Sequence, residues 1–166
     1  MKSYAFLFML MISSVCSTWA QETKAAGIVP GAESKTVVPN SFFYRGKSAS
    51  VQLRNSGAIR TSDGRYVLAG LVDTAGYASN VAEKYQGLFI TEVKLKVGDA
   101  DLAPGEYGFG FVGDKFVITD VGANDVISAS ADTDTELKRP VPLKFAEDGS
   151  NYRLYAGRKY VKIRIE

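Results

Sequence analysis

Histidine is absent from the sequence, and cysteine and tryptophan occur once each. Without histidine, the chain has no imidazole to serve in a Ser-His-Asp triad, as a general base or as a metal ligand. The single cysteine is Cys16, so a protein processed beyond it has no thiol nucleophile and no ordinary structural zinc site. Carboxylate, lysine, tyrosine and hydroxyl groups remain for catalysis. We therefore expect a protein that is not an enzyme and needs no cofactor.

The charges of the chain are nearly balanced. It has 20 Lys and Arg residues against 18 Asp and Glu residues, which gives a formal net charge of +2 at pH 7. So small a net charge produces no long-range attraction for nucleic acid, which we do not expect as a partner. A content of 46% hydrophobic and 23% charged residues is typical of a globular domain.

Residues 1–20 have the three parts of a secretory signal peptide. Lys2 supplies the positive charge, an apolar segment follows over residues 4–15, and small and polar residues lead to Ala20. The apolar segment is too short for a membrane-spanning helix, which takes about 20 apolar residues, so a retained anchor is the weaker alternative. We expect cleavage after Ala20 and a periplasmic or secreted protein. Val15 precedes Cys16 where a lipid-attachment site has a small residue, so we expect no lipidation.

The rest of the chain divides into two parts. Residues 21–40 contain two glycines and two prolines without sustained hydrophobic periodicity, which predicts a flexible leader. Residues 41–166 are predicted to form a single all-β domain of roughly eight to ten short strands, with turn signals every 8–12 residues. This pattern predicts an antiparallel β-sandwich or a small β-barrel with one short helix, which begins at residues 79–80 and stops at Gly87.

Strict alternation marks two of the predicted strands. Residues 88–97 form the clearest one, with Val93, Leu95 and Val97 pointing inward between charged residues. The last strand, over residues 159–166, alternates valine and isoleucine with charged side chains in the same way.

Three alternating aromatic residues, Tyr107, Phe109 and Phe111, share one face of a predicted strand, with Gly108 and Gly110 on the other. Such a stripe is most often the core face, where large aromatics contribute most of the packing energy and the glycines make room for a neighbour. The alternative is a contact surface for a small apolar ligand or a glycan, because glycine in a strand also permits the close approach of a ligand.

Asp132, Asp134 and Glu136 alternate in a polar loop, and oxygen ligands at this spacing suit calcium. The loop is not an EF-hand, because Leu137 and Leu143 occupy the positions that require glycine and glutamate. The three residues are thus candidate calcium ligands, and a solvated acidic loop is the alternative.

Basic and aromatic residues interleave near the C-terminus. This pattern predicts either the solvated outer face of a terminal strand or a surface for an anionic polymer of the cell envelope. The residues are Tyr152, Arg153, Tyr155, Arg158, Lys159, Tyr160, Lys162 and Arg164.

The segments LAPGEYGFGF, RPVPLKF and YRLYAGRKYV resemble parts of uncharacterised exported bacterial proteins of β type. The Pro-Gly-Glu-Tyr turn at residues 104–107 is similar to a turn common in secreted β-sandwich modules. The resemblance covers about the last 65 residues. It implies a β fold and an exported location, and it carries no catalytic residue.

Together these patterns predict an exported β domain that binds a small apolar ligand or a glycan through Tyr107, Phe109 and Phe111. One alternative is a protein-protein interaction or structural module of the cell envelope, acting through an exposed sheet edge or the basic C-terminal residues. A carboxylate-based hydrolase is the other alternative, for which the sequence identifies no acid and base pair.

Overall fold

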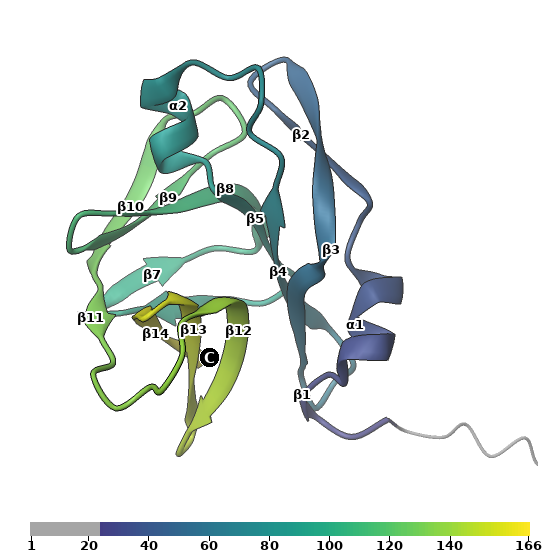
Figure 1. Ribbon diagram of the computed structural model, residues 1–166. Helices are drawn as coiled ribbons and strands as arrows, with labels where there is room; N and C mark the ends of the chain where they lie inside the picture. The colour runs from purple at the N-terminus through teal and green to yellow at the C-terminus, as the bar shows by residue number, and fades with distance from the viewer. Residues whose placement is uncertain (1–23) are drawn as a thin grey trace, which may run out of the picture.

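The computed structural model describes residues 24–166, so the signal peptide predicted over residues 1–20 lies outside the described residues. Two antiparallel sheets and two short helices make up the described part (Figure 1). The prediction of an all-β, sandwich-like fold is therefore confirmed. No helix within residues 24–166 combines the length and the apolar character needed to cross a membrane.

The larger sheet has eight strands in the order β1-β3-β4-β5-β8-β9-β10, with β2 paired to β3 outside this path. Its strands are β1 (Gly27–Ile28), β2 (Ser41–Tyr44), β3 (Lys47–Arg60), β4 (Tyr66–Val72), β5 (Gly87–Thr91), β8 (Gly105–Val112), β9 (Lys115–Thr119) and β10 (Asp125–Ser130).

The smaller sheet has six strands in the order β12-β13-β14-β6-β7, with β11 paired to β14. Its strands are β6 (Leu95–Val97), β7 (Ala100–Leu102), β11 (Asp132–Thr133), β12 (Val141–Asp148), β13 (Asn151–Gly157) and β14 (Lys159–Ile165).

The main hydrophobic core contains side chains from both sheets, and its residues follow the predicted alternation. Val161 and Ile163 of β14 are buried while Lys162 between them is exposed. Phe89 of β5 and Phe116 of β9 are fully buried in the same cluster. Burial of large aromatic and branched side chains is the main favourable contribution to folding here, because the described residues have no cysteine and form no disulfide.

Residues 88–97 do not form one strand. Val93, Leu95 and Val97 are buried as predicted, but β5 ends at Thr91 and the chain crosses to the smaller sheet before β6 begins. The Thr91 hydroxyl donates to the carbonyl of Val93 at 2.6 Å and accepts from the backbone N–H of the same residue at 3.2 Å. These two bonds satisfy the buried N–H and carbonyl of Val93 at the corner between the sheets. The alternation of side chains does not predict this corner.

Regular structure begins well before residue 41, where the predicted flexible leader was expected to end. β1 pairs with β3, and helix α1 (Gly31–Val37) packs on the same strand. Glu33 accepts a hydrogen bond from the buried Arg60 at 2.6 Å, which ties the helix to β3. The leader prediction is wrong for β1 and α1, because a helix of seven residues is too short to show a hydrophobic period.

Helix α2 (Ser79–Lys84) confirms the one predicted helix, and β5 starts at the Gly87 that was expected to stop it. Its N-cap is Ala78, and no side chain caps the first turn. The helix covers the face of β8 that carries Gly110, opposite the aromatic stripe.

Candidate functional site

The structure places Tyr107, Phe109 and Phe111 on one face of β8, as alternation predicts, but their exposure differs. Phe109 is fully buried and lies 5.4 Å from Phe116 between ring centroids. Tyr107 is half-buried, and its hydroxyl donates to the carbonyl of Ala103 at 3.0 Å. Phe111 is half-buried at the end of the stripe. Phe109 is therefore a core residue, and its predicted role in ligand contact is corrected.

The opposite face of β8 is covered. A Cβ added at Gly108 would lie 2.6 Å from the ring of Tyr44, which stacks on Tyr85 at 3.8 Å. A Cβ added at Gly110 would lie 2.7 Å from the backbone carbonyl of Glu83 in α2. The two glycines thus make room for packed neighbours, which is the structural role that the sequence suggested for them.

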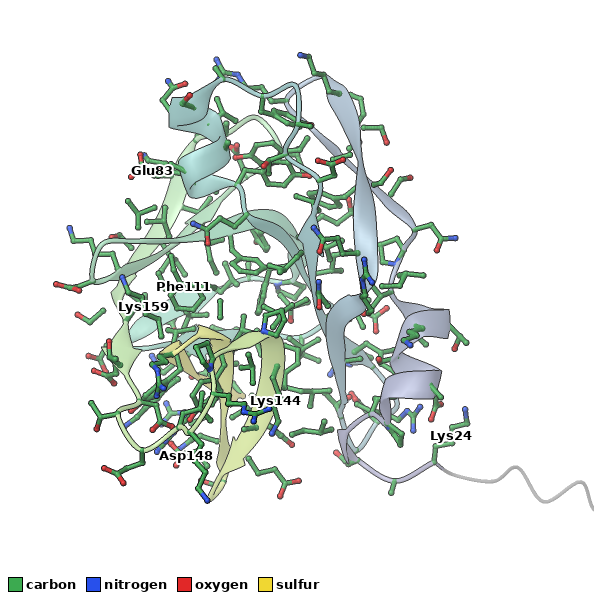
Figure 2. The ribbon with its side chains drawn as sticks, in the orientation of Figure 1. Lys24, Glu83, Phe111, Lys144, Asp148 and Lys159 are labelled. Carbon is green, nitrogen blue, oxygen red and sulfur yellow. The ribbon has the colours of Figure 1, made fainter. Side chains whose placement is uncertain are left out.

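A groove of about 460 Å³ lies between the two sheets, and Phe111 forms part of its wall. This volume is within the range of roughly 300–1,000 Å³ that is typical of small-molecule sites. Figure 2 shows Phe111 and Lys159 beside each other, between β8 and the smaller sheet. The lining residues are Gln52, Leu71, Val72, Thr74, Gln86, Phe111, Pro142, Ala156 and Lys159.

The position of Phe111 is determined on two sides. Its ring lies 4.9 Å from that of Phe116 and 6.4 Å from that of Phe109, where the planes are perpendicular. Its backbone is held by the side chain of Gln86, whose Oε1 accepts from the Phe111 N–H and whose Nε2 donates to the Phe111 carbonyl, both at 3.1 Å. The Gln86 amide thereby extends the β5–β8 pairing by one residue beyond Gly87.

We expect the substitution Gln86→Ala to lower the free energy of unfolding by about 2 kcal/mol, because it leaves the half-buried N–H and carbonyl of Phe111 without partners. Urea unfolding measures this change, and faster hydrogen exchange of the Phe111 amide would locate it. Gln52→Ala is the matched control, since Gln52 is an exposed glutamine of the same groove. Equal stabilities of the two variants would contradict the conclusion that the Gln86 side chain holds the backbone of Phe111.

The walls and rim of the groove differ in chemistry. Phe111, Leu71 and Val72 contribute apolar surface, whereas the amide nitrogen of Gln52 and the hydroxyl of Thr74 have no hydrogen-bond partner among the described residues. Lys159 is the one charged side chain among the described residues that line the groove, and its ammonium donates to the carbonyl of Gly113. An apolar surface with a few convergent polar groups is the usual composition of a ligand site.

Sequence reasoning found only Phe111 of these groove residues as a ligand contact. Gln52 lies within β3 and Gln86 directly before β5, and a single glutamine at either place forms no pattern that predicts a site. Lys159 was expected only as part of the basic C-terminal series.

The three candidate calcium ligands do not converge. Asp134 accepts hydrogen bonds from the backbone N–H groups of Glu136 and Leu137 and, at 2.8 Å, from the hydroxyl of Tyr155. The Tyr155 bond is the main reason why the pKa of Asp134 is below its ordinary value. No group of three potential metal ligands comes together within the described residues. The calcium prediction is corrected: Asp134 closes the loop, and Asp132 is exposed.

Part of the predicted basic series is engaged within the protein. Arg153 donates to Asp148 at 2.9 Å and lies over the ring of Tyr160 at 4.6 Å. Arg158 donates to the backbone carbonyls of Leu137 and Lys138, which lie in the loop between β11 and β12. These contacts favour a structural role for the two arginines, while Lys162 stays exposed.

Within residues 24–166, five carboxyl groups have a pKa below the ordinary value, and in each case a hydrogen bond from a neighbouring side chain is the largest cause. Arg65 lowers the pKa of Asp63 to about 2. Such shifts favour the ionised form, whereas the general acid of a glycosidase needs a raised pKa. None of the five is thus suited to that role: Glu33, Asp63, Asp101, Asp120 and Asp134.

The site therefore lies between the two sheets and has an apolar wall. Its polar groups are the amide nitrogen of Gln52 and the hydroxyl of Thr74, which have no hydrogen-bond partner among the described residues, and the ammonium of Lys159. The chain matches no protein-family model, no curated protein and no solved structure.

Proposed function

We propose that this chain is an exported, non-enzymatic module that binds a short glycan in the groove beside Phe111. The observation that supports the proposal most is the fixed, half-exposed ring of Phe111 in a groove of about 460 Å³. The ring of Phe116 packs against this ring at an angle of 58°, and Gln86 holds the backbone of Phe111. Such preorganisation lowers the entropy cost of binding.

A glycan fits this groove better than a purely apolar molecule. A sugar ring presents C–H groups on its faces and hydroxyls around its edge, so it needs an apolar surface beside polar groups. Phe111 and Leu71 offer the surface, and the unpartnered groups of Gln52 and Thr74 lie in the same groove. Lys159 adds a positive charge, which favours a sugar that carries a carboxylate. Export is proposed from residues 1–20 alone.

The test is a titration of the full chain with a panel of short oligosaccharides, neutral and uronic-acid-containing, followed by amide NMR and calorimetry. We expect one class to shift the amides of Phe111 and Gln86. The substitution Phe111→Ala should weaken its binding about tenfold or more, as truncation of a central aromatic contact does.

The matched control is Phe43→Ala, which removes an aromatic ring that is 62% exposed and does not line the groove. Its affinity should equal that of the unmodified chain, and thermal unfolding checks that both variants are folded. A panel without any binder, or equal losses in the two variants, would overturn the proposed function.

A further inference from the structure

Strand β10 is an unpaired edge of the larger sheet. It pairs with β9 on one side and ends the strand order on the other, at the periphery of the molecule (Figure 1). An edge strand presents a row of backbone N–H and carbonyl groups to which a further strand can bind. None of the residues that line the groove beside Phe111 belongs to this strand, so a role for the edge is independent of glycan binding.

The register identifies which backbone groups point outward. The N–H of Ala131 donates to the carbonyl of Asp114, and the regular pairing of β10 with β9 continues from there through Ala129↔Phe116. Hydrogen-bonded pairs alternate along an antiparallel ladder, so the backbone groups of Ser128 and Ser130 point away from β9. Neither N–H has a hydrogen-bond partner among residues 24–166.

The other strands at the ends of the two sheets are protected against such pairing. β1 has two residues and β7 three, and β12 contains Pro142 and Lys144. β10 has six residues without proline, lysine or arginine. Its one charged side chain, Asp125, is paired with Lys84 at 2.7 Å. A bulge between Asp125 and Ile127 interrupts the edge only at the N-terminal end of β10, so the backbone groups of Ser128 and Ser130 remain available for pairing.

A slot of about 610 Å³ runs beside this edge. It is lined by Ser128 and Ser130 and, across from them, by the turn at Asp99. Asp99 and Asp132 both line the slot, both are exposed, and neither has an ion-pair partner within the described residues. Lys162 is the one cation among the described residues that line the slot, so this lining carries a net negative charge. This charge complements a basic chain.

We propose that the β10 edge is a docking site for an extended segment of a partner protein that carries a basic side chain. The segment adds antiparallel or parallel to β10 as a further strand, bonded to the backbone of Ser128 and Ser130. Its basic side chain lies between Asp99 and Asp132, where opposite charges determine which segments bind. Backbone pairing supplies affinity and the two carboxylates supply selectivity.

The probe is a short synthetic peptide of alternating valine and lysine, added to the full chain and followed by amide NMR. We expect it to slow hydrogen exchange at Ser128 and Ser130. A peptide with glutamate in place of lysine should not bind. N-methylation of alternate peptide bonds should weaken binding about tenfold, since it removes the donors that pair with β10 while the protein is unchanged.

Asp99→Asn and Asp132→Asn should each weaken lysine-peptide binding about threefold, as loss of an exposed ion pair does. Glu106→Gln is the matched control, because Glu106 is an exposed carboxylate outside the slot, and its affinity should not change. Three results would overturn the proposal: no peptide effect at either serine, equal binding of both peptide charges, or protection of the two amides by dimerisation of the chain alone.

Discussion

Phe109→Ala is expected to lower the free energy of unfolding by about 3–5 kcal/mol. The ring of Phe109 is fully buried in the main core, where it packs against Phe111 and Phe116. Removing it forfeits the transfer energy of a phenyl group and leaves a cavity, because β5 and β9 hold their positions through backbone pairing on both sides of β8. Urea unfolding followed by circular dichroism measures the loss.

The exposed Phe43 again provides the control, since Phe43→Ala removes the same atoms from a surface strand and should change stability by less than about 0.5 kcal/mol. A loss below about 1 kcal/mol for Phe109→Ala would mean that the ring is not a core element, because truncation of a buried phenylalanine costs more than that. It would also restore Phe109 as a candidate for ligand contact.

Gly87→Ala should be nearly as damaging, with an expected loss of about 3 kcal/mol. A Cβ at this position would lie 2.5 Å from the carbonyl oxygen of Gly70 and 2.5 Å from Cε1 of Phe109. The first atom belongs to the backbone of β4, which pairs with β5 through Leu71↔Gly87. The second belongs to a ring without free space. Relief of the clash requires β5 to separate from β4 or β8, so strand pairing is lost.

Gly31→Ala is the matched control for this substitution. An added Cβ at Gly31 meets no atom of residues 24–166 within 4 Å, and the residue is the first of α1, where alanine is the better helix former. Its stability should equal or exceed that of the unmodified chain. Thermal unfolding of both variants compares them directly, and a Gly87→Ala protein as stable as Gly31→Ala would show that β5 shifts without cost.

Local patterns were sufficient for most of the strands. Alternation placed the buried side of β14, because a two-residue period depends only on neighbouring residues. The corner after Thr91 and helix α1 were missed. Both depend on contacts that adjacent residues do not reveal: a side-chain bond at the corner and, for α1, the pairing of Glu33 with Arg60.

The candidate site was predictable only in part, for the same reason. The sequence identified the stripe of Tyr107, Phe109 and Phe111 and offered two interpretations, a core face and a contact surface for a ligand. In the structure, Phe109 is a core residue and Phe111 borders the groove. Which end of a stripe reaches a cavity depends on where the second sheet stops covering it. Gln86 acts on Phe111 across a distance of 25 residues in the chain, so no local pattern indicates it.

Strand β14, the last in the chain, pairs with β13, β6 and β11 and so joins the parts of the smaller sheet. During synthesis, the β6–β7 hairpin is finished long before β14 exists, and its β6 edge has no partner until residues 159–165 have been made. The molecule therefore cannot complete its core piece by piece from the N-terminus. These pairings between segments far apart in the sequence predict slow folding of the smaller sheet, because the entropy of closing long loops opposes them.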